Sequence, residues 1–236
     1  SKQTEISVKQ EWGSKCFFAS YSSNSRGCAI FLRKDLPVEV LDDYTYSDPS
    51  GNFLLIVIKF DSQLIPLACV YGPKIDNPEF YERVVFRKIG ELPPEMSGNV
   101  ICGGDWNLVL SQQNDTFDYI HENNVNARTT VLDQMEEKSL IDIWRENHPD
   151  KKRFTWRRRR GKQRARLDFF LVSLTLLPFI EKSDIFPGLD SDHSGLSLVL
   201  DFSKFKRGTG FWKYNNSLHH DLEYTQLVNK TVERVD

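Results

Sequence analysis

Two apolar runs of strand length, separated by three polar residues, constrain the fold of this chain more than any other feature. Phe53–Phe60 reads FLLIVIKF and Leu64–Tyr71 reads LIPLACVY. A short polar connection between two runs rich in β-branched residues predicts a β-hairpin. Pro66 lacks the amide hydrogen that a central strand donates, so we expect the second strand to lie at a sheet edge or to contain a bulge.

Further strands and two helices are predicted around this hairpin. The strands cover Gly27–Leu32, Asn99–Gly103, Phe154–Arg158, Leu167–Ser173, Ser183–Phe186 and Leu196–Phe202. Apolar residues recur at helical spacing in Pro78–Leu92 and Asn126–Leu140. Hairpin-linked strands mixed with helices predict an α+β fold of packed sheets flanked by helices. The chain contains neither G-x-G-x-x-G nor G-x-x-x-x-G-K-[ST], so neither nucleotide-binding loop is expected.

The 236 residues predict one large domain followed by a tail. Lys204–Gly210 is a basic segment with two glycines, typical of a linker, and Ser217 is suited to cap a helix over Leu218–Val235. We therefore expect a domain over residues 1–203, and a basic linker with a helical tail over 204–236.

Cysteine spacing and hydropathy bear on the compartment. The four cysteines are widely spaced without a C-x-x-C pair, and three of them lie in apolar runs. This usage favours a reduced, intracellular protein over a disulfide scaffold. No stretch approaches the roughly 18 apolar residues of a membrane span, so no membrane partner is expected.

The net charge of −2 conceals an uneven layout. Residues 151–166 read KKRFTWRRRRGKQRAR and hold ten Lys or Arg and no acid, so the other 220 residues hold 21 basic and 33 acidic side chains. Phe154 and Trp156 interleave with these cations. Basic side chains can neutralise backbone phosphates while an aromatic ring stacks on a base, so this basic strip predicts contact with a polyanion. A solvated hairpin or a localisation signal is the alternative.

Three polar clusters stand at the ends of predicted strands, where a rigid backbone can hold side chains in a crevice. Asp105 and Asn107 follow the two glycines after Cys102, Asp168 interrupts an apolar strand, and Asp192 and His193 directly precede another. A carboxylate beside an amide can position a water and a phosphoryl oxygen. A His193–Asp168 pair would raise the pKa of the imidazole and fix its tautomer. This inventory suits Mg²⁺ better than zinc.

Each cluster also has a structural interpretation. Asp105 and Asn107 could form a turn after a strand. Asp168 could be held in a salt bridge with Arg166 or Arg164, because a carboxylate among apolar residues is costly to bury unpaired. Asp192 and His193 could be a cap-like Asp and a surface His.

Taken in order, these clusters resemble the signature of the endonuclease/exonuclease/phosphatase superfamily. The stretches are GCAI at 27–30, VYGP at 70–73, GDWN at 104–107, LIDIWR at 140–145, HP at 148–149, FTW at 154–156, RLDF at 166–169 and SDHS at 191–194. Within that superfamily the chain resembles the endonuclease domain of LINE-type non-LTR retrotransposon polyproteins. GFWKYNNSL at 210–218 resembles the segment that leads toward a reverse transcriptase.

The resemblance implies a DNase I-like fold: a four-layer sandwich in which two mixed β-sheets pack face to face with helices outside. It implies a metal-dependent endonuclease that nicks DNA by phosphodiester hydrolysis and leaves a 3′-hydroxyl for target-primed reverse transcription. Mg²⁺ or Mn²⁺ is the implied cofactor. DNA and a covalently linked reverse transcriptase are the implied partners, with action in the nucleus.

The resemblance also assigns roles to residues. Asp105 would activate the attacking water or hold the product hydroxyl, Asn107 would orient the scissile phosphate, and Tyr71 would contact it. Asp192 would contribute to the metal site. His193, paired with Asp168, would bind the phosphate and stabilise negative charge; how the base and electrostatic roles divide between Asp105 and His193 is open. The residues expected to bind DNA are Thr155, Arg157, Arg158, Arg159, Arg160, Lys162 and Arg164.

Two features depart from the pattern of these relatives. They carry an early strand that ends in Asn and a second that ends in Glu, the main metal carboxylate; we expect this chain to begin just after that Glu, with the first strands missing and metal affinity reduced. Glu5 lacks a preceding apolar strand and is not assigned the role. Lys74 stands where relatives often have Asn. The alternative functions are a catalytically dead remnant that binds nucleic acid, or a phosphatase of the same superfamily.

Overall fold

The computed structural model describes residues 2–22, 25–119, 124–188, 190–204 and 224. The chain divides into two units, Ser1–Phe205 and Lys206–Asp236. In the second unit only Tyr224, which is helical, is described. The rest of the predicted tail helix lies outside the described residues. No helix among the described residues is both long enough and apolar enough to cross a membrane.

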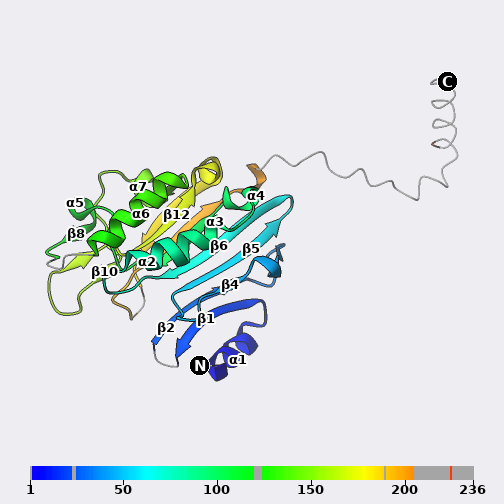
Figure 1. Cartoon of the computed structure of the whole chain (residues 1–236), viewed down its shortest axis with the longest axis horizontal. Coiled ribbons are helices and arrows are strands. Elements are labelled where there is room, and N and C mark those ends of the chain that lie inside the picture. The colour runs from blue at the N-terminus through cyan, green and yellow to red at the C-terminus, as the bar shows by residue number, and fades with distance from the viewer. Residues whose placement is uncertain (1, 23–24, 120–123, 189, 205–223, 225–236) are drawn as a thin grey trace, which may run out of the picture. The chain divides into compact units, whose positions relative to one another are not determined.

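A seven-stranded mixed sheet forms the centre of the first unit (Figure 1). Its strands are β3 (Glu39–Val40), β4 (Tyr46–Ser47), β5 (Phe53–Phe60), β6 (Gln63–Tyr71), β7 (Ile101–Asp105), β9 (Leu140–Asp142) and β12 (Asp168–Ser173). They are ordered β3-β5-β6-β7-β12-β9, with β4 also paired to β5. β6 and β7 are parallel, and the other pairs are antiparallel.

The predicted hairpin is confirmed as β5 and β6, which pair along their whole length. The expectation of an edge strand is wrong, because β6 lies between β5 and β7. Pairing with β7 begins only at Leu67, opposite Ile101. Pro66 therefore has no partner residue on β7, and its missing amide hydrogen breaks no hydrogen bond on that side.

Helices cover one face of this sheet. Pro78–Leu92 was predicted as one helix and forms α2 (Pro78–Phe80), a π-helical stretch (Tyr81–Phe86) and α3 (Arg87–Gly90) in direct succession. The other predicted helix is α6 (Val125–Glu137). The period of two in β5 decides the packing: Phe53, Leu55 and Val57 contact this helical layer, and the alternate residues face the opposite side.

Two β-hairpins pack on the opposite face. Their strands are β1 (Cys16–Ser22) with β2 (Ser25–Phe31), and β13 (Ile180–Phe186) with β14 (Gly195–Leu200). Leu54 of β5 packs against Ala19 and Cys28 of the first hairpin. β14 contacts β12, and α1 (Lys2–Trp12) lies against β1. Helices, sheet and hairpins thus form the expected α+β sandwich.

The remaining elements are short. They are α4 (Pro94–Ser97), α5 (Gln112–Asp115), α7 (Ile143–Asn147), β8 (Thr116–Phe117), β10 (Trp156–Arg157), β11 (Arg164–Ala165) and 3₁₀ turns at Asp42–Tyr44, Leu174–Phe179 and Phe202–Lys204. Strands β10, β11 and β8 form a separate small sheet beside the end of β12. All four cysteines are free thiols.

Candidate functional site

Asp105 is the last residue of β7, and the two glycines before it belong to the strand. A Cβ on Gly104 would lie 2.0 Å from the carbonyl oxygen of Val70, and the φ of Gly104 is +146°. A Cβ on Gly103 would lie 2.3 Å from the ring of Phe170. Only glycine therefore allows β7 to pass this close to both neighbouring strands, and this close passage places Asp105 at the sheet end.

Asp168 begins β12 and lies directly opposite Asp105 in the antiparallel register. The carboxylate of Asp168 is paired with His193, not with the arginines of its own segment. Arg166 instead forms a buried ion pair with Asp115. The structural interpretation of Asp168 as the partner of Arg166 is therefore wrong, and the pairing with His193 is found.

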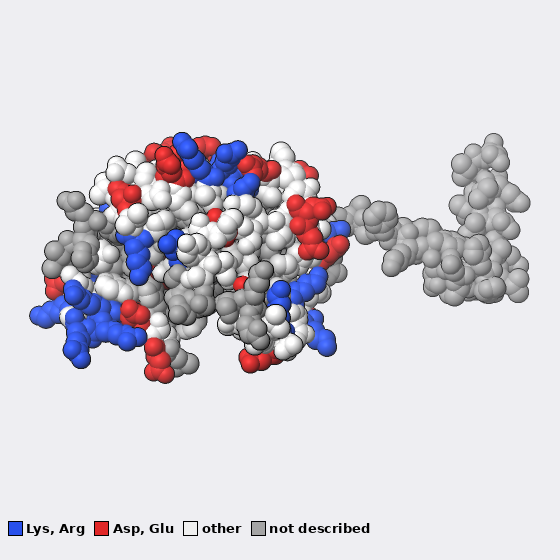
Figure 2. All heavy atoms as spheres, turned by 60° about the horizontal axis from the view of Figure 1, so that its bottom comes forward, with Lys and Arg blue, Asp and Glu red and all other residues white. Residues whose placement is uncertain are grey.

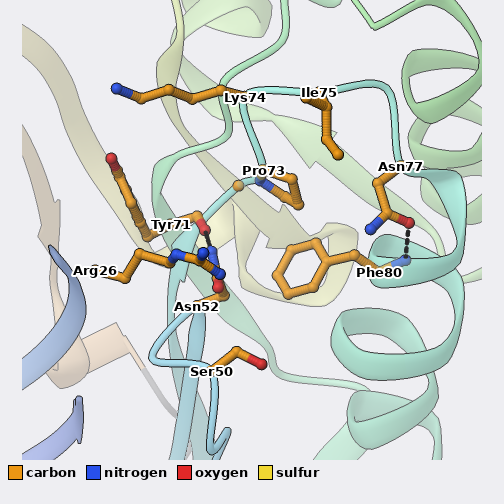
Figure 3. Close-up of a pocket in the computed structure, with 10 residues that line it drawn as sticks. Arg26, Ser50, Asn52, Tyr71, Pro73, Lys74, Ile75, Asn77 and Phe80 are labelled. Carbon is orange, nitrogen blue, oxygen red and sulfur yellow. Dashed lines mark hydrogen bonds between the residues drawn. The ribbon is translucent and has the colours of Figure 1, made fainter. Parts of the chain in front are cut away.

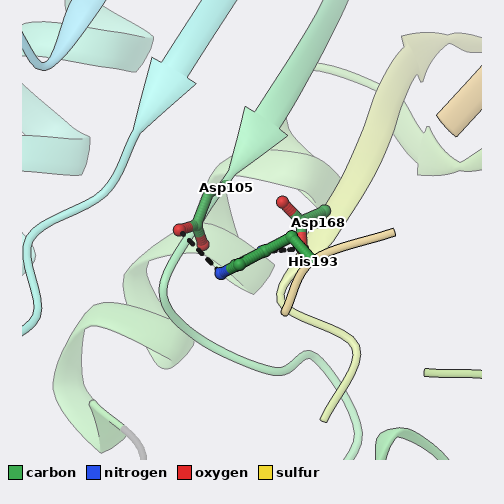
Figure 4. Close-up of side chains that lie close together, drawn as sticks. All are labelled: Asp105, Asp168 and His193. Carbon is green, nitrogen blue, oxygen red and sulfur yellow. Dashed lines mark hydrogen bonds and ion pairs between the residues drawn. The ribbon is translucent and has the colours of Figure 1, made fainter. Parts of the chain in front are cut away.

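His193 completes a cluster of three titratable side chains (Figure 4). Its Nδ1 lies 2.8 Å from Oδ2 of Asp168, and its Nε2 lies 4.0 Å from Oδ2 of Asp105. One ligand atom from each of the three residues lies within 4.8 Å of the others. All three side chains are half-buried, so the cluster faces solvent through a pocket and is not sealed in the core.

The environment raises the pKa of two groups in this cluster, Asp105 and His193. Burial raises the pKa of Asp105 from 3.8 to about 6, and the charge of Asp168 adds to the rise. The hydrogen bond to Asp168 raises the pKa of His193, although partial burial opposes this. A carboxyl group with a pKa near 6 beside a stabilised imidazolium can exchange protons near neutral pH, as acid–base catalysis requires.

Asn107 and Tyr71 lie next to the cluster. Asn107 adopts a left-handed φ of 49°, and its backbone N–H donates to Oδ1 of Asp105 over 2.9 Å. Its side-chain amide donates to the carbonyl oxygen of Gly72 over 2.7 Å. Tyr71 ends β6 at the register position of Asp105. The Asp105 carboxylate and the Gly72 carbonyl thus hold the backbone and the side chain of Asn107 in place.

One pocket of about 790 Å³ collects these side chains. The predicted residues that line it are Tyr71, Asp105, Asn107, Asp168, Asp192 and His193. Sequence reasoning did not predict Tyr119 and Asn124, which also line it. Asn124 donates to the carbonyl oxygen of Asn107 over 2.8 Å and so supports the loop after β7. Both lie in a polar stretch of the sequence without any periodic or motif signal.

The donor chemistry of the cluster fits a divalent cation. Two carboxylates and an imidazole converge on a polar pocket, and carboxylate oxygens suit hard cations. The convergent set is Asp105, Asp168 and His193. Asp192 lines the same pocket, and its Oδ2 accepts a hydrogen bond from Nε1 of Trp156 over 3.3 Å. Its role as a metal ligand stays a prediction.

Thr155 was expected to contact DNA, and this expectation is wrong because its side chain is fully buried. Its Oγ1 accepts hydrogen bonds from the backbone N–H groups of Leu167 and Asp168, over 2.9 and 3.0 Å. Its carbonyl oxygen accepts from the N–H of Ser194 over 2.6 Å. Thr155 therefore holds the segments that carry Asp168 and His193 in place.

The basic strip forms the hairpin of β10 and β11. Arg157, Arg158, Arg159, Arg160, Lys162 and Arg164 are exposed on it. Figure 2 shows a dense group of Lys and Arg on the side of the first unit that carries β10 in Figure 1. Phe154 and Arg166 are buried, so neither belongs to this surface. These exposed cations suit contact with backbone phosphates.

The hairpin is attached to the His193 loop. The backbone N–H of Arg157 donates to the carbonyl oxygen of Asp192 over 3.0 Å, and its Nη1 lies 3.0 Å from Oγ of Ser194. Trp156 and His193 also form a β-bridge. The cationic hairpin and the titratable cluster are thus parts of one structural unit.

No protein-family model matches the chain. It is 24% identical over 233 residues to the "Transposon TX1 uncharacterized 149 kDa protein" of Xenopus laevis. The match covers 97% of this chain and 17% of that protein, so the chain spans only a small part of the relative's length.

Solved structures show the fold. An AP endonuclease from Leishmania major superposes with a TM-score of 0.63 at 15% identity, over 79% of this chain and 70% of that one. The endonuclease domain of TRAS1, a telomere-specific non-LTR retrotransposon, gives 0.58 at 18% identity, over 80% and 81%. An AP endonuclease from Archaeoglobus fulgidus gives 0.63 at 21% identity, over 83% and 82%. The expected DNase I-like fold is confirmed.

Proposed function

We propose that this chain is a metal-dependent endonuclease domain that nicks DNA by phosphodiester hydrolysis. The observation that carries the proposal is the cluster of Asp105, Asp168 and His193, which faces a pocket beside a hairpin of exposed cations. Catalysis of phosphodiester hydrolysis needs a group that activates water, a group that stabilises negative charge, and cations that hold the polyanion. All three requirements have a counterpart here.

His193 would stabilise the charge that develops on the phosphate. Because its Nδ1 lies against the Asp168 carboxylate, the ring orientation is fixed and Nε2 points toward Asp105. A protonated His193 can donate from Nε2 to a phosphate oxygen in the pocket. The raised pKa of His193 keeps that proton bound at higher pH than in a free histidine.

Asp105 would accept the proton of the attacking water. Its pKa of about 6 leaves it largely ionised at neutral pH while it remains a better proton acceptor than an ordinary carboxylate. The N–H of Asn107 orients one oxygen of this carboxylate. Tyr71 and Asn107, at the ends of adjacent strands, are placed to contact the scissile phosphate.

A divalent cation, Mg²⁺ or Mn²⁺, would be held by carboxylates of this pocket, with Asp192 as a further ligand. When bound, it would polarise a phosphate oxygen and lower the pKa of a coordinated water. The exposed arginines of the hairpin would hold the DNA backbone beside Asp168 and His193.

The biological setting is part of the same proposal. The match to a transposon protein and the fold shared with a retrotransposon endonuclease domain support a retrotransposon origin. Hydrolysis at this site would leave a 3′-hydroxyl that a covalently linked reverse transcriptase extends, which requires action in the nucleus.

The test is Mg²⁺-dependent nicking of supercoiled plasmid by the chain and by a version extended upstream. We expect Asp105→Ala and His193→Ala each to reduce nicking by about 10²- to 10⁴-fold, while each variant stays folded and still binds DNA. If both lengths bind DNA but neither nicks it, the chain is a DNA-binding remnant. Hydrolysis of phosphoinositides in place of DNA would indicate a phosphatase.

A further inference from the structure

A second cavity adjoins the candidate active site, and no step proposed above uses it. It has a volume of about 670 Å³, within the range of roughly 300–1,000 Å³ that is usual for ligand sites. Tyr71 and Lys74 line this cavity and the active-site pocket as well. The two cavities therefore meet at the segment that follows β6, and a molecule that spans them would pass Tyr71 and Lys74 (Figure 3).

The walls of this flanking cavity are held in place by internal hydrogen bonds. Phe80 directs its ring toward the cavity, and its backbone N–H donates to Oδ1 of Asn77 over 3.2 Å. On the opposite side, Asn52 is 4% exposed and donates from its side-chain amide to the carbonyl oxygen of Tyr71. Pro73 lies between these two walls. The cavity is therefore largely preformed, with an apolar wall facing a polar one.

Two cations stand at its rim. Arg26 lies with its guanidinium 5.1 Å from the ring centroid of Tyr21, which restrains its direction. Lys74 is exposed and forms no ion pair with any residue that the structure describes. None of the described residues that line the cavity is acidic. An apolar wall between cations suits a ligand with a flat ring and a phosphate.

We infer that this cavity binds one nucleotide of the DNA strand next to the cleaved bond, with its base against Phe80 and Pro73 and a phosphate on Lys74 and Arg26. The inference rests on the proposed function, since it takes its ligand from the strand whose phosphate lies at Asp105. It adds a base-binding subsite on one side of the bond. Stacking contacts of this kind accept every base and give only modest sequence preferences.

The experiment compares DNA duplexes that lack a single base. The nick made by the wild type on plasmid is mapped first, and duplexes of that sequence are then made with an abasic analogue on either side of the bond. Affinity is measured by fluorescence anisotropy with EDTA present, so that no cleavage occurs. For the wild type we expect removal of the base on one side to weaken binding about tenfold, and removal on the other side to have little effect.

Three variants test where that base binds. Ser50→Trp fills the cavity from an exposed position of its lining, and Ile75→Asp adds a negative charge at its 73%-exposed rim. Both should bind intact and abasic duplexes equally. Arg26→Glu should weaken binding to intact DNA. The matched control is Arg33→Glu, an exposed arginine beyond the other end of β2 whose ion pair with Asp35 lies outside the cavity lining; it should keep the wild-type difference.

The outcomes separate this inference from the proposed function. Suppose that the wild type nicks DNA, but that base removal changes DNA affinity equally in the wild type, Ser50→Trp and Ile75→Asp. The nucleotide subsite is then refuted, and the endonuclease function stands. If neither the wild-type chain nor its upstream-extended version nicks DNA, the proposed function fails and this inference fails with it. Loss of the one-sided base effect in Arg33→Glu would also contradict the subsite.

Discussion

Nδ1 of His193 lies 2.8 Å from Oδ2 of Asp168, although the two residues are 25 positions apart. Asp168 begins a strand of the central sheet, and His193 lies between β13 and β14, just before β14 begins in the opposite layer. Their contact joins the two layers at the site. It also turns Nε2 of His193 toward Asp105, the residue opposite Asp168 on the neighbouring strand.

The first prediction concerns the charge of Asp168. Asp168→Asn keeps the shape of the side chain but removes the charge that raises the pKa of His193. We expect the pKa of His193 to fall and nicking to drop by about 10²-fold or more. NMR titration of His193 and plasmid nicking measure the two effects. An unchanged His193 pKa in this variant would show that the pair is not electrostatically coupled.

The second prediction concerns pH and metal binding. Asp105 has a folded-state pKa of about 6, above its ordinary value of 3.8, so below pH 6 a cation must displace its proton. Metal affinity should rise about tenfold per pH unit up to about pH 6 and level off above it. Calorimetry with Mn²⁺ measures this, and Asp105→Asn should bind more weakly with a flatter pH dependence. Equal affinity of the wild type at pH 5 and pH 7 would contradict the prediction.

The same shifts set the pH dependence of metal-free stability. The folded state favours the neutral form of Asp105. The contribution of Asp105 to folding stability is therefore present below pH 3.8 and is lost as the pH rises to about 6. The pKa of His193 is also raised, so its contribution is present below pH 6.5 and is lost as pH rises through its folded value. Melting temperature should depend less on pH in the double variant Asp105→Asn, His193→Gln. If melting temperature depends on pH in the same way in the wild type and in the double variant, other titratable groups determine the pH dependence of stability.

The third prediction concerns Thr155. Thr155→Val keeps the volume but removes the oxygen that accepts from the N–H groups of Leu167 and Asp168. We expect a loss of about 1–3 kcal/mol in the free energy of unfolding, together with reduced nicking at temperatures where the variant is folded. Thr155→Ser retains the hydroxyl and should restore nicking. Full activity of Thr155→Val would mean that this oxygen does not position Asp168.

The fourth prediction separates two kinds of arginine in the basic strip. Arg159→Ala should weaken DNA binding and reduce the slope of log affinity against log salt by about 0.9, with stability unchanged, because this exposed residue would contact one phosphate. Arg166→Ala should destabilise the fold by about 3–5 kcal/mol, because it leaves buried Asp142 without its ion-pair partner and leaves buried Asp115 with Arg145 alone. Salt-dependent anisotropy and chemical denaturation distinguish the two.

Much of the fold followed from local patterns. The bounds of β5 were predicted to the residue, since an unbroken apolar run ended by polar residues leaves little choice. The first hairpin strand, β1, was not predicted, because CFFASYS has polar residues on its exposed half. The predicted edge position of β6 was also wrong. A proline excludes a strand from the sheet interior only where a neighbouring strand would accept a hydrogen bond from the missing amide, and β7 does not pair with Pro66.

The prediction of the candidate site succeeded for residues that motifs and strand ends identify. It failed where burial determines whether a side chain can reach a ligand. The association of Asp105, Asp168 and His193 followed from their places at strand ends and from the family resemblance. Thr155 was assigned to the DNA surface because it lies among arginines, although its hydroxyl faces the core. Sequence gives the charge of a strip but not which of its side chains point inward.

The most direct measurement of the central claim is the chemistry of the nicked end. Plasmid treated with the chain, or its upstream-extended version, and Mg²⁺ is incubated with a DNA polymerase and labelled nucleotides, without further repair. The account predicts label incorporation at a free 3′-hydroxyl, and loss of both nicking and incorporation in Asp105→Asn and His193→Ala, with DNA binding retained. Nicking that persists in either variant would contradict the account. So would a result in which both the wild-type chain and its upstream-extended version bind DNA but neither cuts it.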